Sequence, residues 1–100
     1  MSLDITKKQS DDTLIIFLKG RLDTTTAPEL ESFLSKELDT TTDLEFDMKD
    51  LEYISSAGLR VLLGTQKIMN RQGNMKLLHV QESVMEIFEI TGFVDILTIE

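Results

Sequence analysis

The chain has 100 residues, of which 41% are hydrophobic, and a formal net charge of −8. This size suits one compact domain spanning residues 1–100 around a single core. The acidic balance argues against direct nucleic-acid binding, because Lys and Arg residues that neutralise phosphates supply most of such affinity. The chain has no cysteine and a single histidine, His79, so disulfides are excluded and we expect no cofactor, no metal site and no catalytic centre.

Membrane and export signals are also missing from the sequence. No run approaches the roughly 18 apolar residues of a membrane span. Residues Met1 to Asp4 lack the basic and apolar regions of a signal peptide. We therefore expect a cytoplasmic protein without membrane contact.

The N-terminal part predicts a hairpin. Weak alternation from Leu3 to Lys7 is typical of a short edge strand, and Gln9 to Asp12 supply turn residues. The run from Thr13 to Leu18 is almost continuously apolar and contains β-branched residues. This pattern indicates a central strand that is covered on both faces.

The first helix is predicted to begin at Thr26. The segment Thr26-Ala27-Pro28-Glu29 has the spacing of a capping box and places proline in the first turn. The loop before it contains Gly20 to Asp23. The helix should pack against the sheet through one apolar stripe, formed by Leu30, Phe33, Leu34 and Leu38.

The next strand alternates apolar and acidic residues. Leu44, Phe46 and Met48 alternate with Glu45 and Asp47, which predicts one buried face and one wetter face. A catalytic carboxylate pair would need an acid or base placed opposite, and the sequence indicates none. We therefore interpret the two acids as a solvated face.

The stretch from Asp50 to Arg60 joins this strand to a second helix, which should run from Ser56 to about Gln72. Serine is a preferred N-cap residue, so either Ser55 or Ser56 could cap this helix. The same helix end carries partial positive charge and free N–H groups, which also accommodate a phosphate. Gly73 is the expected C-cap.

One face of the second helix is basic. At about 100° per residue, Ser56, Arg60, Gly64, Lys67 and Arg71 fall within one narrow stripe. The stripe contains three of the ten basic residues of an acidic protein. It is either an ordinary solvated face, with Lys67 and Arg71 favourable near the helix C-terminus, or a surface that holds an acidic or phosphate-bearing partner.

The last quarter of the chain predicts a strand, a helix and a final apolar segment. Met75 to Val80 form the strand, in which His79 is expected at the core edge or surface rather than as a ligand. Ser83-Val84-Met85-Glu86 repeats the capping-box spacing, and Thr91-Gly92 ends the helix. Phe93 to Ile99 should be part loop and part short strand.

The predicted order is therefore β-β-α-β-α-β-α-β, a single α/β domain with a mixed sheet of four to five strands and three to four helices. The strand-helix-strand units from Asp43 onward favour parallel pairing through right-handed crossovers, after an antiparallel hairpin. In such sheets, binding concentrates in the loops that leave the carboxyl ends of strands. Ser55 and Ser56 occupy one of these loops.

The stretches that carry a family resemblance are Gly20 to Asp23, Leu44 to Met48 with Asp50 to Ile54, and Ser55 to Leu62. Through them, and over essentially its whole length, the chain resembles a STAS domain of the bacterial anti-sigma factor antagonists. The resemblance implies a protein-binding regulator that catalyses nothing. In that family a partner anti-sigma factor, which is also a serine kinase, phosphorylates the antagonist, and a PP2C-type phosphatase restores the free form. The unphosphorylated antagonist sequesters the kinase, and the phosphorylated one releases it, so transcription is regulated by partner switching.

Alignment with the family motif on Gly58 places Ser56 at the phosphoacceptor position, with Ser55 as the fallback. Ser55 stands where the family often has Asp, and Ala57 stands where it often has a second Ser or Thr. Asp23 matches an acidic position that the family uses at the partner surface, and its other expected role is to hydrogen-bond its own turn. The expected partner surface comprises Asp23, Ser55, Ser56, Ala57, Gly58, Arg60, Gly64 and Lys67.

Other interpretations stay open. The departures at Ser55 and Ala57 leave room for a non-phosphorylated STAS subunit of a lipid-transport or stressosome-like complex. The cytoplasmic tail of a sulfate transporter fits less well, because the sequence begins at Met1 and has no membrane segment. A hydrolase would need Ser56 as nucleophile and His79 as base, and nothing in the sequence orients the two. The isolated chain is expected to be a monomer or a weak dimer.

Overall fold

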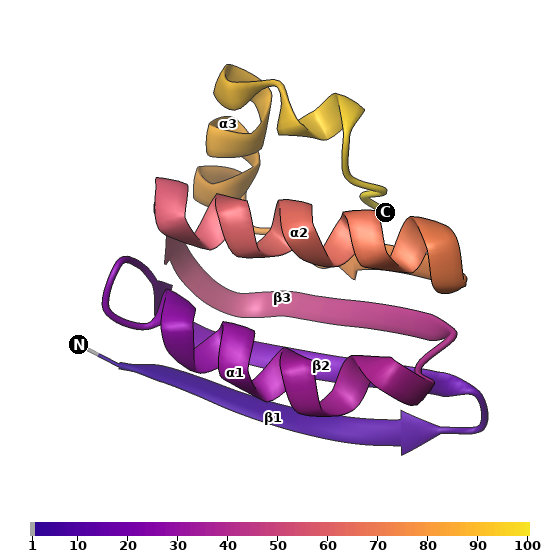
Figure 1. Cartoon of the computed structure of the whole chain (residues 1–100). Coiled ribbons are helices and arrows are strands. Elements are labelled where there is room, and N and C mark those ends of the chain that lie inside the picture. The colour runs from indigo at the N-terminus through magenta and orange to yellow at the C-terminus, as the bar shows by residue number, and fades with distance from the viewer. Residues whose placement is uncertain (1) are drawn as a thin grey trace.

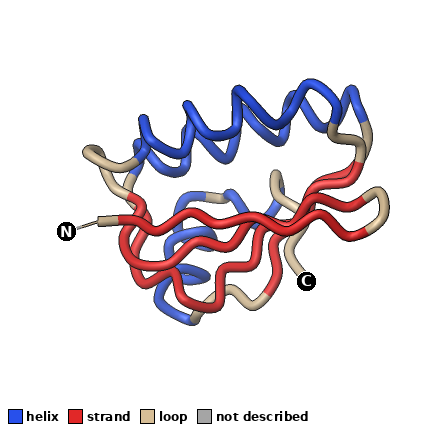
Figure 2. Tube along the Cα trace, turned by 90° about the horizontal axis from the view of Figure 1, so that it is seen from below, coloured by secondary structure: helices blue, strands red, loops and turns tan. Residues whose placement is uncertain are grey.

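A four-stranded sheet in the order β1-β2-β3-β4 carries helices α1 and α2 along one side (Figures 1 and 2). The computed structural model describes residues 2–100. β1 pairs antiparallel with β2, and the β2–β3 and β3–β4 pairs are parallel, so the predicted mixed sheet is confirmed. The strands are β1 (Leu3–Ser10), β2 (Thr13–Leu22), β3 (Asp43–Ile54) and β4 (Asn74–Leu78), and the helices are α1 (Ala27–Glu37), α2 (Ser56–Gln72) and α3 (Glu82–Thr91).

Most of the core lies between this sheet and the pair of helices, and Val84 and Phe88 of α3 also belong to it. Neighbouring residues of β2, β3 and β4 form rows across the sheet. One row is Leu14, Leu44 and Met75, and the row two residues further along is Ile16, Phe46 and Leu77. All six side chains are buried, as are Leu30 and Leu34 of α1 and Leu62 and Met69 of α2. Apolar side chains spaced every 3.6 residues on the helices thus pack against apolar side chains spaced every two residues on the strands.

The other side of β2 is more open than its sequence predicts. Leu14, Ile16 and Leu18 are buried, whereas Ile15 and Phe17 between them are only partly buried. The expectation that β2 is covered on both faces is therefore wrong, although its central place in the sheet is confirmed. Successive residues of β2 point to opposite sides of the sheet. α1 and α2 lie along one side only (Figure 2), so Ile15 and Phe17 on the other side are less buried.

β3 is longer than the predicted alternation and outruns β4. Its pairing with β2 shifts register between Asp47 and Asp50, and beyond that irregularity Leu51 and Ile54 are again buried. β4 pairs with Asp43–Asp47, so among residues 2–100 no strand lies beside the second half of β3 on that side. α3 covers it, with Gln81 Nε2 donating to the Lys49 carbonyl at 2.6 Å.

Two predicted capping boxes are replaced by longer-range hydrogen bonds. α3 begins at Glu82 after the N-cap Gln81, and the Ser83 hydroxyl instead donates to the Glu52 carbonyl at 3.4 Å. α1 begins after Thr26 as predicted, but the Thr26 hydroxyl donates to the Arg21 carbonyl at 2.8 Å and does not cap the helix. In both cases a neighbouring strand supplies a carbonyl that the sequence pattern could not reveal.

The chain end differs from the prediction in one respect. Phe93–Asp95 forms a short 3₁₀ helix, and the expected last strand is reduced to a single parallel bridge between Leu77 and Ile99. β4 ends at Leu78, and His79 turns away with a positive φ of 58°. None of the helices in residues 2–100 is long and apolar enough to cross a membrane.

Candidate functional site

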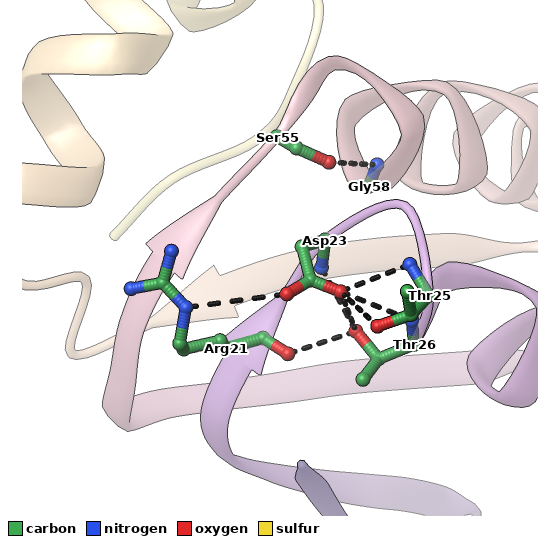
Figure 3. Close-up of polar contacts among 6 residues, drawn as sticks. All are labelled: Arg21, Asp23, Thr25, Thr26, Ser55 and Gly58. Carbon is green, nitrogen blue, oxygen red and sulfur yellow. Dashed lines mark hydrogen bonds and ion pairs between the residues drawn. The ribbon is translucent and has the colours of Figure 1, made fainter. Parts of the chain in front are cut away.

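The candidate site lies where β2 and β3 end side by side. Leu22 and Ile54 are register partners in the parallel pair, so the loops that follow them leave the same edge of the sheet. The Ser55 backbone N–H donates to the Leu22 carbonyl at 2.9 Å and joins the two loops. The loop after β2 carries Asp23, and Ser55 follows β3 (Figure 3). Ser56 comes next, as the first residue of α2.

The two serines have different environments. Ser55 is the N-cap of α2: its backbone is extended, and its Oγ accepts a hydrogen bond from the Gly58 N–H at 3.4 Å. Ser56 is the first residue of the helix and is exposed. Within residues 2–100, its hydroxyl makes no hydrogen bond to another group. The structure therefore answers which serine caps, and it leaves the Ser56 hydroxyl accessible.

Gly58 seats the first turn of α2 on the sheet. A Cβ at this position would lie 2.7 Å from Leu22 Cγ and 2.9 Å from Ile54 Cγ1, closer than side chains pack. Gly58 itself is buried. Only glycine therefore allows the start of α2 to lie this close to the ends of β2 and β3. This close packing fixes the distance of Ser56 from the sheet.

The carboxylate of Asp23 organises the loop after β2 (Figure 3). Its Oδ1 accepts hydrogen bonds from the Thr25 hydroxyl at 2.8 Å, the Thr25 N–H at 3.0 Å and the Thr26 N–H at 3.1 Å. These bonds, the Thr25 hydroxyl first, lower the pKa of Asp23, because they favour its charged form. The expected turn role of Asp23 is therefore present, and its role at a partner surface stays a prediction.

The contacts made here by Arg21, Tyr53, Thr25 and Thr26 were not anticipated from the sequence. The Arg21 guanidinium lies 4.2 Å from the centroid of the Tyr53 ring, and its Nε lies 4.0 Å from Asp23 Oδ2. The buried Thr26 hydroxyl accepts from the Asp23 N–H at 2.8 Å. The spacing of Asp23, Thr25 and Thr26 is an Asx-type turn signal that could have revealed this network.

The basic stripe of α2 runs away from the site. Arg60, Gly64 and Lys67 are all exposed, with Arg60 one helical turn and Lys67 about three turns beyond Ser56. Within residues 2–100, neither basic side chain lies within ion-pair distance of a carboxylate. Ser55, Ser56, Ala57 and Gly58 thus gather beside the Asp23 loop, whereas Gly64 and Lys67 extend the surface along the helix.

His79 pairs with Asp47 of β3. Its Nδ1 is 3.3 Å from Asp47 Oδ2, and its side chain is 61% exposed. The surface position of His79 is as predicted, but the expectation that no acid or base stands opposite Asp47 is wrong. A hydrolase pairing of Ser56 with His79 gains no support, because within residues 2–100 no hydrogen bond joins the two side chains. Within residues 2–100, no three His, Asp or Glu side chains are grouped to hold a metal ion.

Comparison with known proteins identifies the family. The model of the STAS domain matches residues 4–100. The chain is a member of the STAS domain family. Among curated STAS relatives, the anti-sigma-B factor antagonist of Bacillus subtilis (strain 168) is 33% identical over 100 residues, covering 99% of this chain and 92% of the relative. The anti-sigma-B factor antagonist of Staphylococcus aureus (strain NCTC 8325) is 32% identical over 99 residues, covering 97% and 92%.

Solved structures show the same STAS fold. SpoIIAA from Bacillus, solved unphosphorylated and phosphorylated, superposes with TM-scores of 0.75 and 0.74 at 17% and 18% identity. The two alignments cover 97% of this chain and 87% and 91% of the solved chains. An anti-sigma factor antagonist from Mycobacterium paratuberculosis reaches 0.87 at 19% identity, covering 97% of this chain and 84% of that one. The STAS-type fold expected from the sequence is thus confirmed.

Proposed function

We propose that this STAS domain is an anti-sigma factor antagonist whose binding to an anti-sigma factor serine kinase is switched by phosphorylation of Ser56. Unphosphorylated, it sequesters the kinase; phosphorylated, it releases the kinase until a PP2C-type phosphatase removes the phosphate. The observation that carries this proposal is the exposed, unengaged hydroxyl of Ser56 at the first residue of α2. The names of the curated relatives support the antagonist role.

The local structure would accept a phosphate without unfolding. Phosphorylation adds about −1.5 to −2 charges at pH 7. The N-terminus of α2 offsets part of this charge, by roughly 0.3 to 1 kcal/mol at an exposed position. Because Ser55 supplies the N-cap, modification of Ser56 leaves that hydrogen bond in place. The phosphorylated domain should therefore keep its fold.

Release would then come from the contact surface itself. A phosphate on Ser56 introduces charge and bulk at a surface where the kinase packs closely, next to the loop that carries the Asp23 carboxylate. A penalty of about 1.4 kcal/mol weakens binding tenfold, and repulsion at a desolvated contact can exceed that. Arg60, one turn further along α2, would hold the phosphate by a charge-assisted hydrogen bond.

Asp23 contributes to the same surface in this proposal. Its loop is held by the hydrogen bonds of Oδ1, while Oδ2 lies toward Arg21 at 4.0 Å. A basic group of the kinase could bind this carboxylate without rearranging the turn. Asp23 would thus act as a preorganised anionic contact.

Phosphopeptide mapping after incubation with the kinase and ATP tests the proposal. We expect one phosphate per chain, located at Ser56, and none in Ser56→Ala. Ser55→Ala is the matched control, since it removes the neighbouring hydroxyl and should still accept phosphate. Phosphate found at Ser55 alone would show that Ser55, and not Ser56, is the phosphoacceptor. No modification of the wild-type chain would favour the non-phosphorylated STAS subunit instead.

A further inference from the structure

A groove runs between α1 and α2, starting beside Ser56. It consists of three adjoining hollows that share lining residues, and the middle hollow has a volume of about 180 Å³. The end near the site is lined by Thr24 and Ala57, and the far end by Arg71 and Gln72. Its apolar lining is formed by Ala57, Val61, Leu34, Leu38 and Ile68.

Gly64 lies in the middle of this groove and has no internal reason to be glycine. In the described part of the chain, residues 2–100, a Cβ at Gly64 would meet no atom within 4 Å, whereas one at Gly58 would collide with Leu22 and one at Gly73 with the Thr42 carbonyl. Glycine is unfavourable inside a helix, and Gly64 is an interior residue of the 17-residue α2. The missing side chain leaves space on the outer surface, which an external group can occupy.

The charges of the groove walls are opposite in sign. On the α2 side, Arg60 and Arg71 line the hollows, and Lys67 lies on the same helix face beside them. α2 has no acidic residue, in a chain of net charge −8. Within residues 2–100 none of the three is ion-paired. The α1 side contributes Glu31 and Asp39. Between the walls, the Ile68 side chain is 39% exposed although it is a large hydrophobic residue.

We propose that this groove binds an amphipathic helix of the anti-sigma factor kinase, which makes the inference dependent on the proposed function. A large apolar side chain of that helix fills the space over Gly64 and contacts Ile68. Its acidic side chains face Arg60, Lys67 and Arg71, and neutral or basic ones face Glu31. In helix-in-groove binding, an amphipathic helix lays its apolar face into an apolar groove, and the charges on the two walls would fix which polar side chains of the helix lie beside each wall. The acidic α1 wall argues against a membrane or nucleic acid as the occupant.

Substitutions at Gly64 give opposite effects on folding and binding if the proposal holds. Gly64→Ala should raise the melting temperature by several degrees, because alanine is a better helix former and meets no neighbour. The same change should lower the affinity of the domain for the kinase, and Gly64→Met should lower that affinity tenfold or more. Ser32→Ala is the matched control: Ser32 is exposed on α1 and away from the groove, so helix propensity rises while affinity stays unchanged.

Charge reversal tests whether the basic residues of α2 contact acidic side chains of the bound helix. Arg60→Glu combined with Lys67→Glu should slow association and reduce affinity at least tenfold, with an effect that shrinks at high salt. Lys36→Glu makes the same kind of charge change on the far face of α1 and should have little effect.

Calorimetric titration of the purified kinase of the source organism into each variant measures these affinities. Wild-type affinity in Gly64→Met overturns the groove proposal. If Ser56→Asp still weakens binding in that case, the proposed function stands and only the groove is wrong. A wild-type chain that does not bind the kinase contradicts both.

Discussion

The backbone N–H of Ser55 donates to the carbonyl of Leu22 at 2.9 Å, and this bond ties the end of β2 to the N-cap of α2. It brings the Asp23 turn and the serine pair to one edge of the sheet, although they are far apart in the sequence. The serine pair therefore starts from a fixed position, set by strand register and by the contact of Gly58 with Leu22 and Ile54.

Ser55→Ala should destabilise the fold, because it removes the oxygen that accepts from the Gly58 N–H. Loss of an N-cap costs about 1 kcal/mol, which corresponds to a fall of roughly 4 to 8 °C in melting temperature for a domain of this size. Thermal unfolding followed by circular dichroism measures the change. Ser56→Ala is the control and should melt within about 2 °C of wild type, since it removes no cap. Equal losses in the two variants would show that the capping assignment is wrong.

Gly58→Ala should also destabilise the fold. The new Cβ would lie 2.7 Å from Leu22 Cγ, so the helix start or the Leu22 side chain must move. Overpacking of this kind costs about 1 to 3 kcal/mol. Urea denaturation gives the free energy of unfolding, with Gly64→Ala as the control on the same helix. Because Gly64 has open space around it, that variant should be more stable than wild type, and a stable Gly58→Ala would contradict the packing argument.

Replacement of Asp23 by Asn should reveal a pH-dependent contribution to stability. The hydrogen bonds from Thr25 and Thr26 lower the pKa of Asp23 in the folded state. A lowered folded pKa means that the carboxylate stabilises the fold above its unfolded pKa, near 3.9, and loses that effect as pH falls through the folded value. Wild type should thus exceed Asp23→Asn in stability by a constant amount at neutral pH.

The difference between the two proteins should narrow below about pH 4, where the carboxylate becomes protonated. Urea unfolding at pH 7, 5, 4 and 3 measures it. Asp4→Asn serves as the comparison, because Asp4 is an exposed carboxylate on β1. A gap between wild type and Asp23→Asn that stays constant down to pH 3 would contradict the hydrogen-bond explanation.

Hydrophobic periodicity was sufficient to predict the sheet, the helices and their order. The alternation of Leu44, Phe46 and Met48 and the boundaries of α2 at Ser56 and Gln72 appear in the structure as predicted. These features depend on which faces are apolar, and that information is local. The prediction of a last strand was wrong, because a 3₁₀ helix occupies part of that segment and Ile99 forms a single bridge with Leu77.

Tertiary neighbours decided what sequence spacing could not. Ser55 and Ser56 have the same chemistry, and only the folded backbone shows that Ser55 accepts from Gly58. Gly58 and Gly64 are the same residue type on one helix, yet one faces Leu22 and the other faces open space. The Arg21–Tyr53 contact depends on a register shift after Gly20, which no periodicity in the sequence signals.

The affinity of the kinase for Ser56→Asp and Ser56→Ala tests the central claim most directly. Calorimetric titration with the purified kinase measures both variants beside wild type. The aspartate introduces negative charge at the helix start, whereas alanine keeps the surface neutral, so we expect Ser56→Asp to bind at least tenfold more weakly and Ser56→Ala to bind like wild type. Equal affinities for the two variants would contradict the phosphorylation switch.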